Sequence, residues 1–278
     1  MKKINRRSFL AAAGLTAAAL ALTACGGSVS STASSTASSA ASSEAASTSA
    51  AAELTTVEAG KLTMATNATF PPYEMTTDSG EIEGIDVDTA KAIAEKLGLE
   101  LQIDDMDFDA ALLSVQQGKA DIVMAGVTVT DERKAVMDFS DSYATGIQSI
   151  IVPEGSDITS PDDLAGKKIG TQRGTTGYIY CSDDFGDDAV VAYDDGLTAV
   201  QALKNGQVDA VVIDNAPAKE YVAANPGLVI LDTSYAEEDY AIGMAKGSAL
   251  EDAVNAALEE LKADGTLQSI VDKYITAE

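Results

Sequence analysis

Residues 111–124 read ALLSVQQGKADIVM, and residues 199–212 read AVQALKNGQVDAVV. The two stretches align without gaps, and each consists of a helical run, a glycine suited to end the helix, an Asp, and a short apolar run typical of a buried strand. Corners of this kind favour the same residue types, so the match can also be convergent. From about Glu53 to its end the chain has roughly 225 residues, which is enough for two ordinary domains. We therefore predict two lobes of similar build.

The chain around the first stretch continues the alternation of strands and helices. Strands are expected at Lys61–Ala65, Leu99–Ile103 and Ile122–Ala125, with helices before Gly98 and over Phe108–Gln117. This alternation predicts an α/β fold with mostly parallel strands. Ligands of such sheets bind beyond the carboxyl ends of the strands, which draws attention to residues 125–133 and 213–215.

The composition excludes several classes of function. The 278 residues include 44 Asp and Glu against 18 Lys and Arg, a formal charge of −26, with no His and two Cys. A nucleic-acid binder needs a basic face, so DNA and RNA are excluded as main partners. Without His, the chain can build neither a His-ligated zinc site nor Ser/His or Cys/His catalysis. We expect no metal and no cofactor.

The N-terminus has the pattern of an export signal. Met1–Arg7 is basic, and Phe9–Ala24 is a run of 16 apolar or small residues that ends at Cys25. This run is short for a spanning helix, so we predict a signal peptide over residues 1–24. Leu22–Cys25 resembles the bacterial lipobox, which predicts a lipidated Cys25. Asn5–Leu10 resembles a twin-arginine motif, and the choice between Tat and Sec export stays open.

A low-complexity segment follows the signal. Of the 27 residues in Gly26–Ala52, 23 are Ser, Thr or Ala, and residues 25–52 are therefore expected to be the lipidated Cys and a flexible tether. Loss of residues 1–24 leaves 14 Lys and Arg against 44 acids, or −30. Cys181 is then the one unmodified thiol, and we interpret it as a small buried apolar side chain. The expected location is the outer face of the cytoplasmic membrane, or a periplasm-facing membrane in a cell with two membranes.

Arg133 is the first candidate for ligand binding. Only Arg133 and Arg173 remain after the signal, and a guanidinium matches a carboxylate or phosphate. Thr128 adds a hydroxyl, and Gly126 permits close approach of the backbone. The alternative is that Thr130 caps a helix on which Arg133 forms only a surface ion pair.

A second anion-binding signal and one acid complement Arg133. Residues 170–177 read GTQRGTTG and precede an expected helix, without the spacing of a Walker loop, so a mononucleotide is not expected. A small carboxylate could be bound by Arg133 together with Thr175 or Thr176. Asp214 follows a strand and either pairs with an ammonium group or caps the next helix. Phe70 and Phe108 either stack on a ligand side chain or pack in the core. The set would complement a zwitterion.

These residues resemble the solute-binding proteins of polar amino acid ABC transporters, family 3, from Lys61 to Tyr274. The motifs that carry the resemblance are FPPY at 70–73, GIDVD at 84–88, FDA at 108–110, AGVTVTDER at 125–133, DFS at 138–140, GTT at 174–176, VDA at 208–210 and DGT at 264–266. The resemblance implies a two-lobed periplasmic-binding-protein-like (type II) fold with two hinge strands. Residues 53–145 plus 239–278 would form lobe 1, and residues 146–238 would form lobe 2.

The resemblance also implies roles for single residues. Arg133 and Thr128 would bind the ligand α-carboxylate, with help from Thr175 or Thr176. Asp214 and the Gly126 carbonyl would bind the α-ammonium. The remaining positions would enclose the ligand side chain: Phe70 and Phe108 as a sandwich, Asn67 and Gln172 at its distal group.

The distal position departs from a common pattern. Many relatives have Asp where this chain has Asn67, and members that bind cationic side chains often rely on an acid there. Asn67 therefore favours an uncharged polar side chain such as that of glutamine over a basic one, unless Glu74 or an acid from a neighbouring loop substitutes.

The implied function is capture of an amino acid by hinge closure and delivery to an ABC permease, by a monomer that is not an enzyme. An enzyme on the same scaffold, similar to cyclohexadienyl dehydratases, is the alternative, and it would need a general acid next to a leaving hydroxyl. The sensor domain of a membrane kinase is a third possibility, which would require a truncated chain.

Overall fold

The computed structural model describes residues 54–275. The predicted signal peptide of residues 1–24, the lipidation of Cys25 and the tether of residues 25–52 lie outside the described residues. Within 54–275, no helix combines the length and the apolar composition that crossing a membrane requires.

The first sheet contains five strands in the order β5-β1-β6-β14-β7. Strands β1, β5 and β6 are parallel, and β14 runs antiparallel to β6 and β7. The strands span Lys61–Thr66 (β1), Glu100–Asp105 (β5), Ile122–Val123 (β6), Met137–Phe139 (β7) and Gly243–Ala245 (β14). A separate three-stranded sheet precedes the first helix and comprises β2 (Thr69–Phe70), β3 (Glu74–Thr76) and β4 (Ile82–Glu83).

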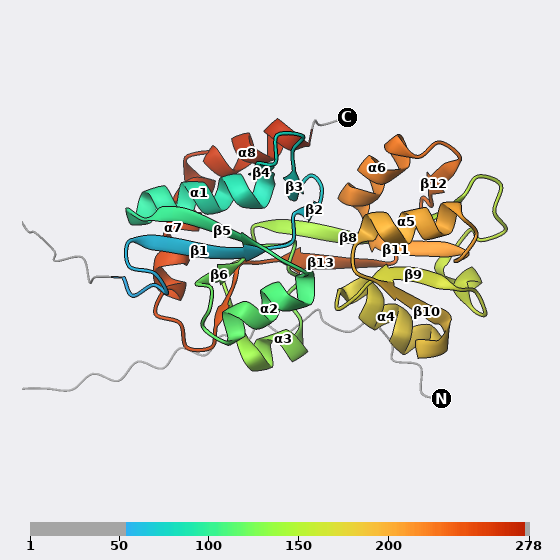
Figure 1. Ribbon diagram of the computed structural model, residues 1–278, viewed down its shortest axis with the longest axis horizontal. Coiled ribbons are helices and arrows are strands. Elements are labelled where there is room, and N and C mark those ends of the chain that lie inside the picture. The colour runs from blue at the N-terminus through green and yellow to red at the C-terminus, as the bar shows by residue number, and fades with distance from the viewer. Residues whose placement is uncertain (1–53, 276–278) are drawn as a thin grey trace, which may run out of the picture. The chain divides into compact units, whose positions relative to one another are not determined.

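Helices cover both faces of the first sheet (Figure 1). Leu62, Met64 and Ile122 pack with α1 (Ile85–Leu97) and α7 (Glu251–Ala263) in one core cluster. Ala65 and Val123, which point to the opposite face, pack with α2 (Phe108–Gln116). The alternation follows from the two-residue period of a strand. Helix α8 (Thr266–Tyr274) joins the α1 side, and the short α3 (Asp131–Val136) precedes β7.

The second sheet has the order β10-β9-β11-β8-β12, with β13 also paired to β8. Strands β9, β10 and β11 are parallel, whereas β12, β13 and β11 run antiparallel to β8. The strands span Ala144–Pro153 (β8), Ile169–Gln172 (β9), Val190–Tyr193 (β10), Ala210–Asp214 (β11), Leu228–Ile230 (β12) and Ala236–Tyr240 (β13). Its helices are α4 (Thr176–Phe185), α5 (Gly196–Lys204) and α6 (Asn215–Ala224), and short 3-10 turns lie at Pro161–Leu164 and Asp187–Ala189.

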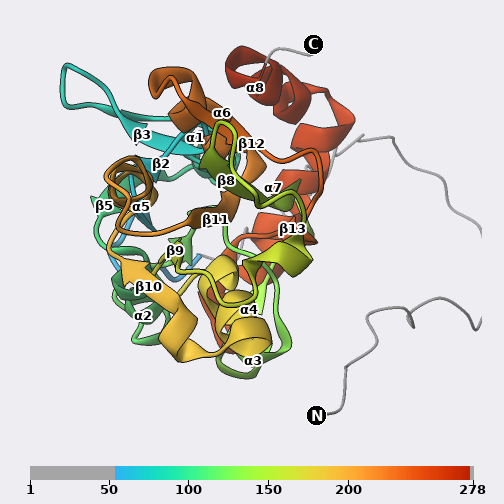
Figure 2. The ribbon, with the colours of Figure 1, turned by 90° about the vertical axis from the view of Figure 1, so that its right-hand side faces the viewer.

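The second sheet is also covered on both faces. Both views show α5 and α6 on one side of this sheet and α4 on the other (Figure 1, Figure 2). Ile151 and Val211 pack toward α5, and Ile150 and Val212 pack toward α4, where Cys181 is fully buried. Burial raises the pKa of the Cys181 thiol to about 12, which agrees with its interpretation as an apolar side chain.

Two crossings connect the sheets. The chain leaves the first sheet after β7 and enters the second at β8, and it leaves β13 to re-enter the first sheet at β14. Strands β8 and β13 are antiparallel partners over their whole overlap, from Ala144 opposite Tyr240 to Gln148 opposite Ala236. This pair of strands is the hinge of the two-lobed α/β fold.

The gapless match within the sequence corresponds to a repeated unit of structure. Helix α2 leads to β6 in the first sheet, and α5 leads to β11 in the second. Gly118 and Gly206 follow the two helices with φ of 65° and 68°, a left-handed conformation that glycine adopts without strain. The prediction of two lobes of similar build is confirmed. Two strand predictions were inaccurate in extent: β6 ends at Val123 rather than Ala125, and β5 continues to Asp105 rather than ending at Ile103.

Candidate ligand-binding site

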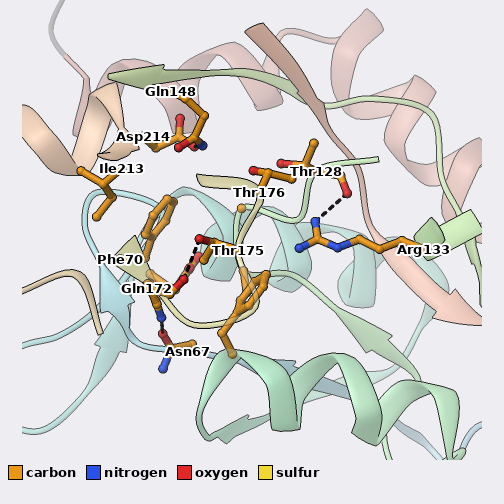
Figure 3. A pocket seen from close by; sticks show the side chains of 14 residues that line it. Asn67, Phe70, Thr128, Arg133, Gln148, Gln172, Thr175, Thr176, Ile213 and Asp214 are labelled. Atoms are coloured by element: carbon orange, nitrogen blue, oxygen red, sulfur yellow. Dashed lines mark hydrogen bonds between the residues drawn. The ribbon is translucent and has the colours of Figure 1, made fainter. Parts of the chain in front are cut away.

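A pocket lies where the carboxyl ends of β6 and β11 meet. The structure brings all ten predicted ligand-binding residues into its wall (Figure 3). They are Asn67, Phe70, Phe108, Gly126, Thr128, Arg133, Gln172, Thr175, Thr176 and Asp214. The lining also includes Glu74, Ala125, Gln148 and Ile213.

Arg133 is a buried cation that points into the pocket. Thr130 does cap α3, because its Oγ1 accepts from the Arg133 backbone N at 3.2 Å. Arg133 is nevertheless only 8% exposed, so the alternative in which Arg133 forms only a surface ion pair is wrong. Its Nη1 donates to the Thr128 carbonyl at 2.8 Å and its Nη2 to the Gly174 carbonyl at 3.2 Å.

Arg133 forms no direct ion pair with another residue of the described part of the chain. Its guanidinium lies over the Phe108 ring, 5.4 Å from the centroid. Burial lowers the pKa of Arg133, and the charge of Glu238 opposes that effect. A buried guanidinium without an ion-pair partner is suited to bind an anionic group of a ligand.

The hydroxyls of Thr175 and Thr176 have different partners. Thr175 is the N-cap of α4: its Oγ1 accepts from Tyr178 N at 3.3 Å and donates to the Gln172 carbonyl at 2.8 Å. The Thr176 hydroxyl instead donates to Glu238 Oε2 at 2.9 Å. The Thr175 side chain therefore holds the helix start, and both residues contribute to the pocket wall.

Asp214 ends β11 and is buried beside the hinge. Although it occupies the N-cap position of α6, its side chain makes no capping hydrogen bond, so the capping interpretation is wrong. Oδ1 accepts from Ile147 N at 3.0 Å, and Oδ2 accepts from Gln148 Nε2 at 2.7 Å. Burial is the main cause that raises the pKa of Asp214 to about 7, and the charge of Glu238 adds to it. A cationic group in the pocket would restore the ionised form.

Gly126 shapes the wall between the two charges. Its φ is 55°, and its N–H donates to Asp86 Oδ2 at 3.0 Å. A Cβ at this position would lie 2.7 Å from the Phe70 ring. Only glycine allows the backbone and the aromatic ring to approach this closely.

The two phenylalanines combine packing and lining. Phe70 is half-buried at the end of β2 and stacks on Tyr73, with ring centroids 5.8 Å apart. Phe108 opens α2 and packs with Ala111 and Val115 in the core under the pocket. Both rings reach the pocket, so the core-packing alternative describes only part of their environment.

The far end of the pocket is lined by amides. Gln172 Nε2 donates to Asn67 Oδ1 at 2.9 Å, and Asn67 Nδ2 donates to the Met106 carbonyl at 2.9 Å. Glu74 is the nearby acid, and it is fully buried. Burial first, and then the charge of Asp86, raise the pKa of Glu74 well above its usual value. Burial therefore disfavours ionisation of Glu74, and a cationic group in the pocket would oppose that effect, as at Asp214.

Two polar residues of the site escaped the sequence reasoning. Gln148 lies in the apolar strand β8 and bridges Asp214 and Glu238 through Nε2, at 2.7 and 3.0 Å. Glu238 lies among several acids on β13 and is buried, while its neighbours Glu237 and Asp239 are exposed. The alternation along a strand was the available signal, but it could not show which face of β13 is buried.

The two sheets, the paired hinge strands and the polar pocket between matching strand ends define a two-lobed binding protein. The family model of bacterial extracellular solute-binding proteins, family 3, matches residues 62–277, and the chain belongs to this family.

Individual relatives extend the comparison. A probable histidine-binding protein of Neisseria gonorrhoeae is 33% identical, over 99% of this chain and 98% of that protein. The structure of the arginine-, lysine-, histidine-binding protein ArtJ of Geobacillus stearothermophilus is similar with a TM-score of 0.75 and 35% identity, over 78% of this chain and 96% of that one. An ancestral arginine-binding protein bound to glutamine has a TM-score of 0.75 and 44% identity, over 78% of this chain and 99% of that one.

Proposed function

We propose that this protein is the extracytoplasmic substrate-binding component of an ABC importer and that it captures a polar L-amino acid for a membrane permease. One observation carries the proposal: Arg133 and Asp214 lie on opposite sides of one pocket, with Thr128 and Thr176 between them (Figure 3). A zwitterionic amino acid carries a carboxylate and an ammonium group, which pair with a cation and an acid at such separate positions. The relatives, which are named for binding histidine, lysine or arginine, support the same class of ligand.

Within that class, the amide-lined end favours an uncharged polar side chain such as that of glutamine. Asn67 and Gln172 supply both donors and acceptors, and burial disfavours the ionised form of Glu74. An arginine-binding relative that also binds glutamine supports overlap between the two ligands. The proposed preference is therefore for glutamine over arginine or lysine.

Closure of the two lobes would enclose the ligand. Side chains already connect them: Arg133 Nη2 with the Gly174 carbonyl at 3.2 Å, Gln172 with Asn67, and the Tyr221 hydroxyl with the Thr69 carbonyl at 2.6 Å. The hinge strands β8 and β13 absorb the movement of the lobes. Exclusion of water from the closed pocket strengthens each charge pair with the ligand.

The proposal also includes the oligomeric state and the location of the protein. The protein acts as a monomer, lipidated at Cys25 and anchored to the outer face of the cytoplasmic membrane. It binds its ligand and releases it unchanged.

A thermal-shift panel of the twenty amino acids on the mature chain tests the function. An amino acid present at 1,000 times its dissociation constant should add about 4 kcal/mol to the free energy of unfolding. Glutamine is expected to give the largest shift. A panel in which no amino acid shifts the transition would refute the function, and a larger shift with arginine would refute only the preference.

Gly174→Ala should weaken binding of the amino acid about tenfold by opposing closure. Gly174 belongs to the second lobe and has φ of 73°, and a Cβ there would overlap the Asp109 carboxylate of the first lobe. The backbone strain of an alanine in this conformation is about 1 kcal/mol, and the overlap with Asp109 adds to it only in the closed form. Isothermal titration calorimetry measures the loss.

Gly206→Ala is the matched control for this prediction. Gly206 also lies in the second lobe, has φ of 68°, and has nothing near the position of a Cβ. It should share the strain but keep the wild-type affinity. Equal affinity losses in the two variants would contradict a role of Gly174 in closure.

A further inference from the structure

Glu238 is a buried carboxylate directly behind the pocket wall. It is 7% exposed and lies on the same face of β13 as Tyr240, which is fully buried. Its Oε2 accepts from Thr128 Oγ1 at 3.1 Å, from Thr176 Oγ1 at 2.9 Å and from Gln148 Nε2 at 3.0 Å. All three donors line the pocket, whereas Glu238 itself does not.

These hydrogen bonds determine which way the two hydroxyls point. A carboxylate oxygen without a hydrogen only accepts hydrogen bonds, and Glu238 Oε2 accepts from all three donors. Each threonine hydroxyl has a single hydrogen, and in both cases Glu238 accepts it. Toward the pocket, Thr128 and Thr176 can therefore offer only lone pairs, which are suited to a ligand donor.

Both hydrogens of the Gln148 side-chain amide also have acceptors. Its Nε2 donates one hydrogen to Asp214 and the other to Glu238. The surface around Asp214 consequently presents acceptors, while Arg133 presents donors on the opposite side (Figure 3). An ammonium group has three N–H donors and no acceptor, so it fits the first surface and a carboxylate fits the second.

We propose that Glu238 is a positioning residue that assigns the hydroxyls of Thr128 and Thr176 to the ligand α-ammonium and leaves the α-carboxylate to Arg133 and backbone N–H groups. The inference rests on the proposed function, since it concerns the same pocket. It differs from the role that the sequence resemblance implied for Thr128, which was contact with the carboxylate.

The same arrangement couples the ammonium site to closure. Thr128 lies in the first lobe, between β6 and α3, and Thr176 opens α4 in the second. Glu238 on the hinge strand accepts from both hydroxyls in this structure, in which side chains of the two lobes are in contact, so the complete set of acceptors for the ammonium is present with the lobes together.

The test compares ligands that differ only in the ammonium group. The probes are L-glutamine with glutaramate, which is glutamine without its α-ammonium, and L-arginine with 5-guanidinopentanoate. Affinities of the wild type, Glu238→Met and Glu238→Gln are measured by calorimetry, with competition titrations for weak ligands. Met has a similar length but only a weakly accepting sulfur, whereas Gln keeps an acceptor oxygen without the charge.

Glu238→Met should lower the affinity for the amino acid about 10- to 100-fold, the effect of losing well-oriented hydrogen bonds to a charged group. The affinity for the analogue without the ammonium should stay within about threefold or rise, because the freed hydroxyls can then donate to its carboxylate. Glu238→Gln should recover most of the amino acid affinity. Equal losses for both members of a probe pair would show a merely structural role and overturn the inference.

Two further outcomes separate failure of this inference from misfolding of the variant and from failure of the proposed function. If Glu238→Met does not fold, Thr128→Val provides the second variant: it should weaken binding of the amino acid but not of its analogue, and equal losses would again overturn the inference. If the wild type binds neither L-glutamine nor L-arginine nor any other amino acid of the thermal-shift panel, the proposed function fails instead.

Discussion

Arg133→Met should reduce the affinity for the amino acid about 100- to 1,000-fold, the range expected when one partner of a buried charge pair is removed. The ligand carboxylate would enter a buried site without its cation and would lose two charge-assisted donors. Calorimetric titration with the amino acid identified by the thermal-shift panel measures the loss.

The fold should tolerate this substitution. The start of α3 is held by the Arg133 backbone N and the Thr130 hydroxyl, which the substitution leaves in place. The methionine side chain can still pack against Phe108, where the guanidinium now lies. An unchanged far-ultraviolet circular dichroism spectrum would verify that the lost affinity does not reflect unfolding.

Arg173→Met is the matched control. Arg173 is the other arginine of the body, and it forms an exposed ion pair with Asp194 at 3.8 Å. Exposed pairs of this kind contribute at most about 1 kcal/mol, so this variant should bind as the wild type does. Retention of affinity within a few-fold by Arg133→Met would refute the assignment of Arg133 to the carboxylate.

The ends of the strands were the predictable part of this site. Arg133, Asp214 and Gly126 follow strands whose apolar runs and flanking glycines are visible in the sequence. In an α/β sheet the carboxyl end of a strand is where a ligand binds, so the position of the pocket follows from local pattern. The resemblance to a family added the expected return of the chain to the first lobe.

The partners of these residues were not predictable. Whether Asp214 caps α6 or faces the pocket depends on Ile147 and Gln148, which pair with β11 from 66 or more residues away in the chain. Glu238 follows Glu237 and precedes Asp239, and only the pairing of β13 with β8 selects it for burial. Long-range strand pairing therefore decides the electrostatics of the site, and local pattern contains no record of it.

Lowering the pH below 7 should weaken binding of the amino acid, by about tenfold for each pH unit down to pH 5. Burial raises the pKa of Asp214 to about 7, while the ligand ammonium stays protonated throughout this range. Only the ionised carboxylate attracts the ammonium, so protonation of Asp214 competes with the ligand. The groups that face Asp214 are Glu238 and Tyr240 of β13, Tyr73, and the Ile147 and Gln148 donors of β8.

Asp214→Asn separates this mechanism from the other buried acids. The variant should bind about 100-fold more weakly at pH 8, because the ammonium loses its charge partner, and its affinity should change little between pH 8 and pH 6.5. Burial also raises the pKa of Asp86 to about 6 and the pKa of Glu74 well above its usual value, and these two acids are the competing sources of pH dependence because Asp86 accepts from Gly126 N and Glu74 lines the pocket. Titrations of both proteins between pH 5 and 8 distinguish Asp214 from these acids. A tenfold loss per pH unit that persists between pH 7 and pH 6 in Asp214→Asn would remove Asp214 as the origin of the effect.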